Sequence, residues 1–99
     1  MITFDNTITL IASEPINGRN GSTDARQKVV RGHVELPSMT LQNNMAAMGK
    51  AADLAIYIYR KELDIPYSHV EILGTRYRIE SISRTNRERI ARLTVSRGL

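Results

Sequence analysis

The stretch HVEILGTRYRIESISR, residues 69–84, alternates apolar and charged residues around one glycine, a pattern typical of a β-hairpin. Gly74-Thr75 suits the centre of a two-residue type II′ turn, because glycine adopts a positive φ without steric cost. Counting outward from that turn places the aliphatic and tyrosyl side chains together on one face. The predicted core residues of the hairpin are Val70, Ile72, Gly74, Tyr77 and Ile79.

The charged residues of the same stretch fall on the opposite face. The predicted cross-strand ion pairs are Glu71–Arg78 and His69–Glu80, and such pairs contribute about 0.2–1 kcal/mol each. Because Arg78 then has a carboxylate partner and Glu80 interrupts the basic run, we interpret the stretch as a hairpin rather than as a nucleic-acid groove. The inward-outward alternation slips near Ile82 and again between residues 90 and 93. A bulge or a strand end is expected at each place.

Four further segments have the patterns of strands: 6–12, 27–37, 52–63 and 89–97. Gly32 is expected at a bulge or a close backbone contact, and Pro37 is expected to end its strand. Segment 52–63 is apolar on both faces. It should therefore be the most central strand, or a strand whose second face meets another subunit. Six strands with almost no helix predict one mainly β domain, residues 1–99, folded as a small antiparallel barrel or sandwich.

Two long segments, 13–26 and 38–51, separate the predicted strands of the amino half. The first contains two Asn-Gly pairs and a proline, and is expected to be a long mobile loop. The second is either one short helix near 41–48 or a flexible loop. Ser38 or Thr40 can cap such a helix, and Gly49 can terminate it. Loops of this length in a small domain are usually functional or disordered.

The formal net charge of the 99-residue chain is +4, from fourteen Lys and Arg against ten Asp and Glu. Arginine makes forked contacts with both carboxylates and phosphates. Near the carboxyl end, several arginines have only Glu88 as a nearby acidic residue. They are predicted to line a subunit interface or to face DNA, with the interface favoured: Arg84, Arg87, Arg89, Arg92 and Arg97.

No catalytic or metal-binding motif is found. Without cysteine the chain has no disulfide or thiolate metal site. His33 and His69 each stand beside a glutamate and lack zinc-ligand spacing, so they are expected to be surface imidazoles paired with carboxylates. Residues 44–51 only partly match a phosphate-binding loop. We therefore expect neither an enzyme nor a cofactor, and no metal.

Targeting signals are not expected either. The first residues lack a basic stretch of the kind that begins a signal peptide, and no apolar run is long enough for a transmembrane helix. Tyr57 and Tyr59 have the aromatic faces on which nucleic-acid bases can stack. Because their strand is otherwise apolar, we expect them to pack against a neighbouring strand or chain instead.

The carboxyl half has a distinctive order of elements. A strand is followed by a hairpin with a Gly turn and an aromatic-x-Ile pair, then by a polar turn and a last apolar strand with Arg near its end. The residues that fill this pattern are Gly74, Tyr77, Ile79, Ile82, Arg92, Leu93, Val95 and Arg97. In this order residues 53–97 resemble the head–tail joining proteins of tailed bacteriophages, the small head-completion (head-closure or stopper) proteins. The amino half matches only in its strand-loop-strand layout.

The resemblance implies a structural virion protein of the phage neck. Such a protein is a β-barrel that assembles into a cyclic ring, expected to be a dodecamer, beneath the portal. The implied partners are a portal or portal-adaptor protein above, a tail terminator or tail tube protein below, and packaged double-stranded DNA in the channel. The ring would help close the channel after packaging and would provide the docking surface for the tail. The chain would occupy the host cytoplasm during assembly and the virion afterwards, with no membrane contact.

The resemblance also suggests roles for the two long segments, because loops of such proteins project into the channel or reach neighbouring rings. We predict that 38–51 is the channel or gate element and that 13–26 contacts adjoining rings. The gate residues would be Leu41, Asn43, Asn44, Met45, Met48 and Lys50. The residues that contact a neighbouring ring would be Asn17, Arg19, Asn20 and Arg26.

A second hypothesis is a free-standing β-barrel that binds nucleic acid through its arginine-rich carboxyl-terminal strands and its tyrosines. Its affinity should fall steeply between roughly 50 and 200 mM salt, because several phosphate contacts would release counterions. Weak or absent binding of naked DNA would favour the ring hypothesis.

Overall fold

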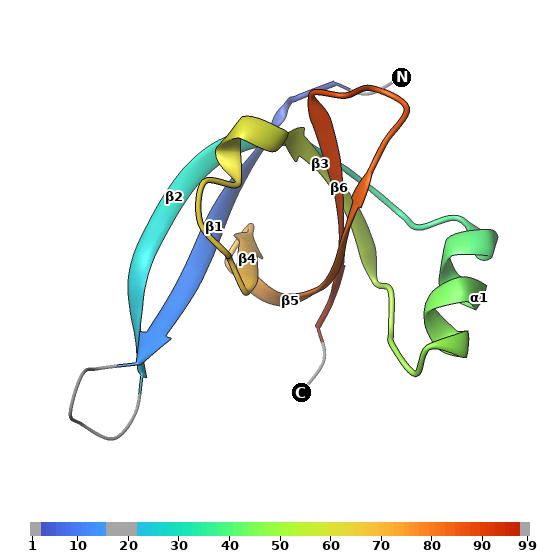
Figure 1. The fold of residues 1–99 in the computed structure, drawn as a ribbon, viewed down its shortest axis with the longest axis horizontal. Helices are drawn as coiled ribbons and strands as arrows, with labels where there is room; N and C mark the ends of the chain where they lie inside the picture. Colours follow the sequence, from blue (N-terminus) through green and yellow to red (C-terminus); the bar gives the residue numbers. More distant parts are fainter. Residues whose placement is uncertain (1–2, 16–21, 98–99) are drawn as a thin grey trace.

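The computed structural model describes residues 3–15 and 22–97, which form a closed antiparallel barrel of six strands (Figure 1). Around the barrel the order is β1-β2-β3-β6-β5-β4, and β4 pairs back with β1. The strands are β1 (Asn6–Pro15), β2 (Ser22–Glu35), β3 (Leu54–Tyr59), β4 (His69–Ile72), β5 (Thr75–Arg84) and β6 (Ile90–Ser96). A helix, α1 (Met39–Ala47), follows β2, and a 3-10 turn, η1 (Arg60–Glu62), follows β3. The predicted mainly β barrel of six strands is confirmed.

Aliphatic side chains fill the interior of the barrel. The buried core consists of Ile8, Leu10, Ala12, Val30, Ile56, Ile58, Tyr67, Val70, Ile72, Leu93 and Val95. Burying one such large aliphatic side chain stabilises the fold by about 1.5–3 kcal/mol. Strand β5 contributes Tyr77 and Ile79, which are partly buried against this core. The face of the hairpin that was predicted to point inward therefore does so.

Gly32 marks the place where β2 approaches β1 and β3 most closely. A Cβ atom there would lie 2.5 Å from Cδ1 of Ile8 and 2.8 Å from the carbonyl oxygen of Tyr57. Pairing continues through this position without a register shift. Of the two predictions for Gly32, the close backbone contact is confirmed and the bulge is not.

The turn of the β4–β5 hairpin differs from the prediction by one residue. Its two central residues are Leu73 and Gly74, with φ of 50° and 81°, instead of Gly74 and Thr75. Two positive φ values are the mark of a type I′ turn, whose twist matches that of the flanking strands. Val70 consequently lies opposite Tyr77 rather than opposite Ile79. The set of inward residues is unchanged, because each partner moved by two positions, a full side-chain period.

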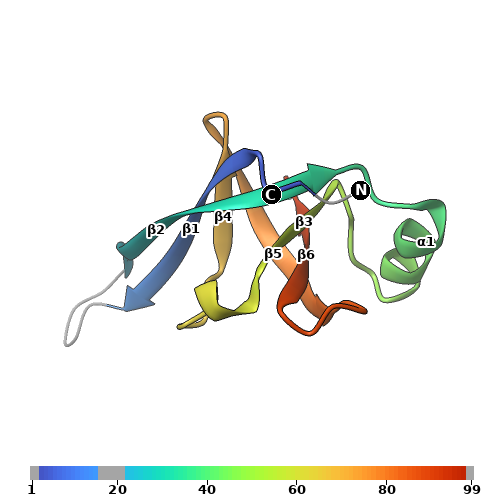
Figure 2. The same ribbon diagram turned by 90° about the horizontal axis from the view of Figure 1, so that it is seen from above.

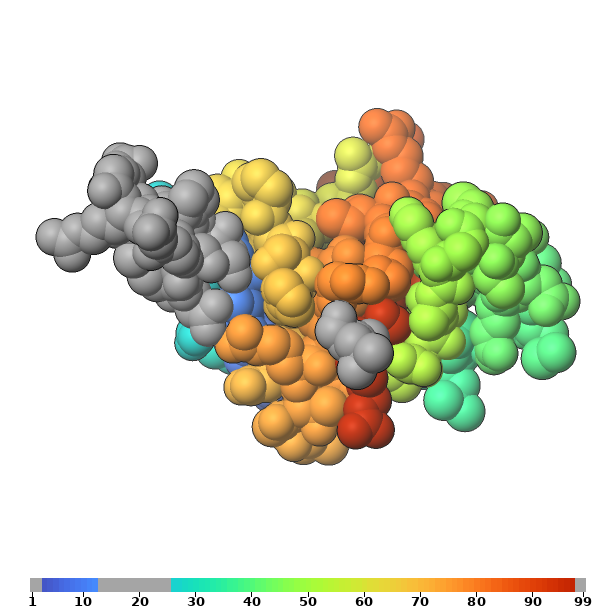
Figure 3. Space-filling model, turned by 90° about the horizontal axis from the view of Figure 1, so that it is seen from below, coloured from blue at the N-terminus to red at the C-terminus, as the bar shows by residue number. Residues whose placement is uncertain are grey.

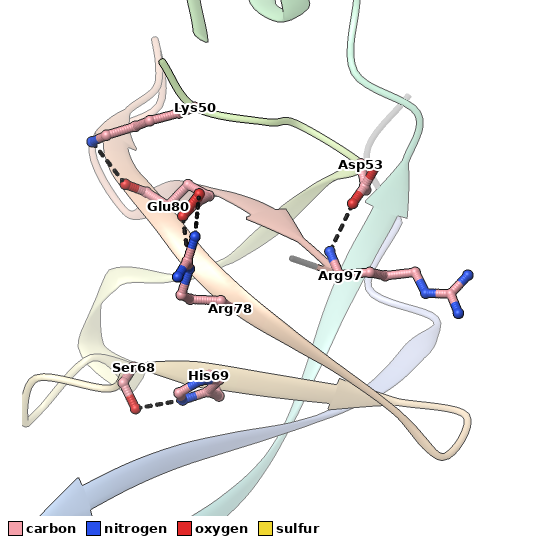
Figure 4. Close-up of polar contacts among 7 residues, drawn as sticks. All are labelled: Lys50, Asp53, Ser68, His69, Arg78, Glu80 and Arg97. Atoms are coloured by element: carbon pink, nitrogen blue, oxygen red, sulfur yellow. Dashed lines mark hydrogen bonds and ion pairs between the residues drawn. The ribbon is translucent and has the colours of Figure 1, made fainter. Parts of the chain in front are cut away.

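The changed register also corrects the predicted ion pairs. Glu71 and Arg78 are not opposite each other, and neither are His69 and Glu80. Arg78 instead makes a forked contact with Glu80 on its own strand, with Nε 3.0 Å from Oε1 and Nη2 3.4 Å from Oε2 (Figure 4). His69 Nδ1 lies 2.7 Å from the hydroxyl of Ser68, so its expected pairing with a carboxylate is wrong.

A β-bulge interrupts the pairing between β5 and β6. The strands pair regularly up to Ile79 and again from Ser81, which leaves Glu80 as the extra residue. After the bulge Ser81 faces outward, and Ile82 lies on the inner side at the barrel end. The slip predicted near Ile82 is thus present two residues earlier. The second predicted slip is absent, because β6 pairs regularly with β3 and β5 between Ile90 and Leu93.

Local signals explain why α1 forms where it does. The Ser38 side chain caps the helix by accepting a hydrogen bond from the Leu41 amide at 3.1 Å. At the other end Gly49 adopts a φ of 73°, its N–H donates to the Ala46 carbonyl, and the Lys50 N–H donates to the Met45 carbonyl. These two bonds form a Schellman motif. Between the helix and the flexible loop proposed for 38–51, the helix is therefore confirmed.

The predicted long loop at 13–26 is largely wrong. Pairing of β1 with β2 continues, after an irregularity at residues 12–14, to Glu14 opposite Thr23 and Pro15 opposite Ser22. Strand propensity and the continuing ladder outweigh the turn residues over most of the segment. Residues 16–21 lie outside the described part of the chain.

Segment 52–63 is also shorter as a strand than predicted. β3 ends at Tyr59, where the backbone turns into the 3-10 turn of residues 60–62. β3 pairs with β2 on one side and with β6 on the other. In a closed barrel no strand is more central than the rest, so this part of the prediction does not apply.

The molecule has two appendages at opposite ends of its longest axis. The β1–β2 hairpin extends beyond the pairing with β4 on one side, and the segment that carries α1 lies on the other (Figure 2). The Cα trace measures 44 × 28 × 25 Å along its principal axes. Within the described residues, neither helix has the length and hydrophobicity that crossing a bilayer demands.

The type I′ turn predicts that Leu73→Asn stabilises the protein by about 0.5–1 kcal/mol. Asparagine tolerates a positive φ far better than leucine, and Leu73 is 98% exposed, so little burial is lost. The change should appear as a higher urea midpoint. Leu73→Val, which is β-branched, should lower it. An unchanged midpoint for both variants would contradict the assigned turn.

Candidate functional site

Positively charged side chains gather where β3 and β5 end and β6 begins. We call this region the basic end and define it by Arg60, Lys61, Arg84, Arg87 and Arg89, together with the acidic residue Glu88. All five cationic residues are exposed. The polar turn between β5 and β6 projects from the surface here (orange-red in Figure 3). Shallow hollows connect the region, one of them lined by Tyr59, Arg60, Lys61, Glu88 and Arg89.

Backbone hydrogen bonds hold this end in place. The Arg60 N–H donates to the Arg89 carbonyl at 2.7 Å, and the Arg60 guanidinium donates to the Glu88 carbonyl at 3.1 Å. Within the turn, the Thr85 hydroxyl lies 2.9 Å from the Arg87 carbonyl and 3.0 Å from the Ile90 carbonyl, which share its one proton, and it accepts a hydrogen bond from the Arg87 N–H. The cationic side chains therefore project from a turn that hydrogen bonds hold in place.

The five arginines singled out in the sequence do not form one cluster. Arg84, Arg87 and Arg89 lie at the basic end, whereas Arg97 lies at the far end of the seven-residue strand β6. At about 3.3 Å per residue this separates it from Arg89 by roughly 25 Å. The Arg97 N–H donates to Asp53 Oδ2 at 2.7 Å, and its side chain points away from that contact (Figure 4).

Sequence reasoning missed two contributors to the basic end. Arg60 and Lys61 directly follow β3, and Tyr59 is its last residue. They join the β5–β6 turn because Tyr59 pairs with Ile90 across the β3–β6 ladder. The sequence run YRK at the end of an apolar strand was the available signal. This signal could be interpreted only with the knowledge that β3, which ends at Tyr59, pairs with the last strand, β6.

Arg92 lies on the outer face near the basic end, in a polar network with β2 and β3. One cross-strand row of this face contains His33, Tyr57 and Arg92. The Tyr57 hydroxyl interacts with both Glu35 and Arg92. Arg92 Nε is buried and has no hydrogen-bond partner among the described residues. Arg92 is thus half-buried and interacts with Tyr57, whereas Arg87 and Arg89 in the β5–β6 turn are exposed.

The imidazole of His33 is paired with a carboxylate, as expected. Its Nδ1 accepts a hydrogen bond from the Thr3 N–H at 3.4 Å, so Nε2 carries the proton and donates to Glu35 Oε2 at 3.0 Å. This bond lowers the pKa of Glu35 below its ordinary value of 4.5, with a smaller contribution from Tyr57, and it outweighs the raising effect of burial. Burial and the Glu35 carboxylate together raise the pKa of Tyr57.

The α1 segment, predicted as the channel or gate element, lies outside the barrel beside β5 (green in Figure 3). The predicted gate residues differ in how exposed they are. The exposed ones are Asn43, Asn44, Met48 and Lys50, while Leu41 is half-buried. Met45 is only 2% exposed, and its sulfur accepts a hydrogen bond from the Ser81 hydroxyl at 3.9 Å. Met45 therefore anchors the helix and is not available to a channel.

The surface beneath α1 consists of small and hydroxyl side chains. Ala55 and Thr94 lie in the same cross-strand row as Ser81, and both are fully buried. The hydroxyls of Thr94 and Ser96 are buried without a hydrogen-bond partner among the described residues. Each such group costs about 1–3 kcal/mol relative to its hydrated state. Lys50 adds one hydrogen bond between the α1 segment and β5, donating to the Glu80 carbonyl at 3.2 Å.

The residues predicted to contact a neighbouring ring lie mostly beyond the described part of the chain. Asn17, Arg19 and Asn20 fall in residues 16–21. Arg26 is exposed on β2 opposite Ala12.

Within residues 3–15 and 22–97, no three His, Asp or Glu side chains come together as metal ligands would. Ser68 and His69 are 2.7 Å apart, but no acid orients the imidazole as a catalytic triad requires among the contacts that they make.

No known protein family matches the chain when it is compared with models of such families, and no curated protein sequence matches it significantly.

Met45→Ala should release α1 while leaving the barrel folded. The fall in the global free energy of unfolding should be smaller than the 2–5 kcal/mol typical of a buried Met→Ala change, because the Thr94 hydroxyl gains water. Hydrogen exchange should show lost protection only at amides 41–50, which bond within the helix and its caps. Met48→Ala, with the side chain 60% exposed, is the matched control and should change nothing. Parallel loss of protection in the barrel strands would contradict a separable helix.

Glu35→Gln should change how the free energy of unfolding depends on pH in the acidic range. Folding lowers the pKa of the Glu35 carboxyl. Its ionised form therefore contributes stability that is complete above about pH 4.5 and is lost as the pH falls through the pKa of the folded state. Wild type should exceed the variant by about 0.2–1 kcal/mol at pH 7, since Glu35 is half exposed. The difference should vanish in strong acid. In a His33→Ala background the pH 7 difference should shrink; an undiminished difference would contradict the pairing.

Proposed function

We propose that this chain is a structural virion protein of the bacteriophage neck. In this proposal it forms a homo-oligomeric ring beneath the portal, helps close the DNA channel after packaging and offers the docking surface for the tail. It acts by assembly and not as an enzyme. Support comes first from the order of elements in residues 53–97, which corresponds to β3, the β4–β5 hairpin, the polar turn and β6.

The observation that carries the proposal is the pair of appendages on a closed barrel (Figure 2). A ring needs head-to-tail contact between two different surfaces of each subunit, with a rotation that closes. A closed barrel offers no free sheet edge for such contact around its wall. The β1–β2 hairpin and the α1 segment supply two different surfaces at opposite ends of the molecule.

The surface of the α1 segment suits a protein contact. Leu36, Met39 and Met48 are 80%, 70% and 60% exposed. Methionine side chains are flexible and polarizable, so they adapt to irregular partner surfaces. Three large apolar side chains so close in the chain would gain free energy by burial in an assembly.

The attachment of α1 is also consistent with a moving part. Met45 is its one buried apolar anchor, and it contacts Ser81, the cross-strand neighbour of Thr94, whose hydroxyl is buried without a hydrogen-bond partner among the described residues. Lifting the helix loses the burial of Met45 but would hydrate this hydroxyl, so the two effects partly cancel. A low cost of release is what a channel or gate element needs, and we propose this role for the segment.

Deleting residues 40–48 tests the proposal. The variant should remain a soluble folded barrel, because the core contains no residue from this segment. In phage assembly it should yield DNA-filled heads that leak DNA or lack tails, as scored by electron microscopy and infectivity. A variant with 40–48 replaced by an equally long Gly-Ser segment separates the effect of length from that of the side chains. Normal infectious particles from the deletion would refute the role of the segment.

The ring itself is tested with purified heads. Wild-type protein should co-sediment with DNA-filled heads that carry a portal and should not co-sediment with heads that lack one. Failure to bind portal-bearing heads would overturn the neck assignment.

A further inference from the structure

The net charge of the chain is concentrated at the basic end. The whole sequence has fourteen Lys and Arg and ten Asp and Glu. The basic end holds five of these cations and one carboxylate, Glu88. The rest of the chain therefore has nine residues of each sign and is neutral overall. A surplus of +4 on one small surface creates a local field that attracts anions.

The cations of this surface are not neutralised by the protein. The ion pairs of Lys28, His33 and Arg78 all lie outside the basic end. Arg60 uses its guanidinium to hold a backbone carbonyl. The side chains of Arg87 and Arg89 make no hydrogen bond to any described residue, and so remain available to a ligand.

The aromatic rings near the basic end already contact other side chains of the protein. Phe4 stacks on the Tyr59 ring with centroids 4.5 Å apart, and the Lys61 ammonium lies over the same ring at 5.8 Å. Tyr57 contacts His33, with ring centroids 5.8 Å apart, and interacts with Arg92. These contacts occupy part of both tyrosine rings, whereas the cationic side chains of the basic end are exposed, so the surface favours contact with a phosphate backbone over base stacking.

From this geometry we infer that the basic end binds the phosphodiester backbone of double-stranded DNA without sequence preference. Arg87, Arg89, Arg84 and Lys61 contact phosphates, and the Arg60 bond to the turn positions them. Forked guanidinium groups match phosphate oxygens in shape and charge. The site excludes Arg97, at the opposite end of the barrel, and Arg92, which is engaged with Tyr57. This inference concerns the isolated chain and is separate from the neck assignment: a ring subunit whose basic end faces the packaged duplex would also bind naked DNA, so such binding does not by itself exclude a ring.

An acidic protein surface is the competing ligand, and the distribution of apolar groups argues against it. Protein interfaces have an apolar centre within a polar rim. Of the large exposed apolar side chains in the described residues, Tyr59 and Ile82 line hollows at the basic end. The others lie elsewhere: Val29, Leu36, Met39, Met48 and Leu73.

The test is binding of a fluorescent duplex of about 20 base pairs, measured by anisotropy at several salt concentrations. Three to five phosphate contacts predict a log–log salt slope of about −2.7 to −4.5. Affinity should therefore fall about 40- to 500-fold between about 50 and 200 mM salt. The double variant Arg87→Ala/Arg89→Ala should bind at least about tenfold more weakly, with a slope less negative by about 1.8.

The matched control is Arg26→Ala/Arg97→Ala, which removes the same charge from exposed sites away from the basic end. It should keep nearly wild-type affinity, and circular dichroism should show that both double variants are folded. Equal loss of affinity in the two variants would overturn the inference, because it would indicate binding to net charge alone. So would no binding at about 50 mM salt, tighter binding of a single strand than of the duplex, or equal binding of poly-glutamate. Whatever the result, co-sedimentation with portal-bearing heads still tests the neck assignment by itself.

Discussion

The short ladder between β1 and β4 is the contact on which the whole barrel depends. It comprises only three residue pairs, from Thr9 opposite Glu71 to Ile11 opposite His69. The Ser68 N–H extends it by donating to the Ile11 carbonyl at 2.9 Å. Because β1 and β2 belong to the amino half and β4 and β5 to the carboxyl half, this ladder joins two hairpins into a closed sheet. Leu10 and Val70 face each other across it and are completely buried.

Side-chain alternation was sufficient to predict the class of fold and the inner face of the β4–β5 hairpin. It was insufficient for the register, which depends on the turn. Leucine seldom adopts a positive φ, so local preference pointed to Gly74-Thr75, whereas the folded chain places Leu73 there at 50°. Tertiary pairing outweighs that local cost. The predicted ion pairs were wrong for the same reason, since they were counted from the turn.

The composition of the candidate site could be predicted only in part, because proximity in a barrel is decided by strand neighbours. Arg84, Arg87 and Arg89 are close in sequence and close in space. Arg60 joins them through the β3–β6 ladder, and Arg97 leaves them because β6 carries it to the other end. Neither fact is visible in residue spacing.

For the α1 segment, the sequence placed Met45 and Met48 together among the predicted gate residues. It could not indicate that one of them is buried against β5 while the other is exposed. Capping signals were more informative, since Ser38 and Gly49 act within a few residues of their partners. The helix caps, which are local in sequence, were thus recovered, whereas the contact between α1 and the distant strand β5 was not.

The β1–β2 ribbon is the one part of the sheet that the barrel does not enclose. Beyond Ile11 in β1 and before His33 in β2, the described residues pair only with each other, so both outer edges keep unpaired backbone groups. Exposed edges of this kind invite other chains to add strands and to aggregate. Pro15 lacks the N–H that an added strand would use, and Arg26 places an exposed charge on β2. Both features oppose the addition of a further strand to the ribbon, so its unpaired edges need not lead to association.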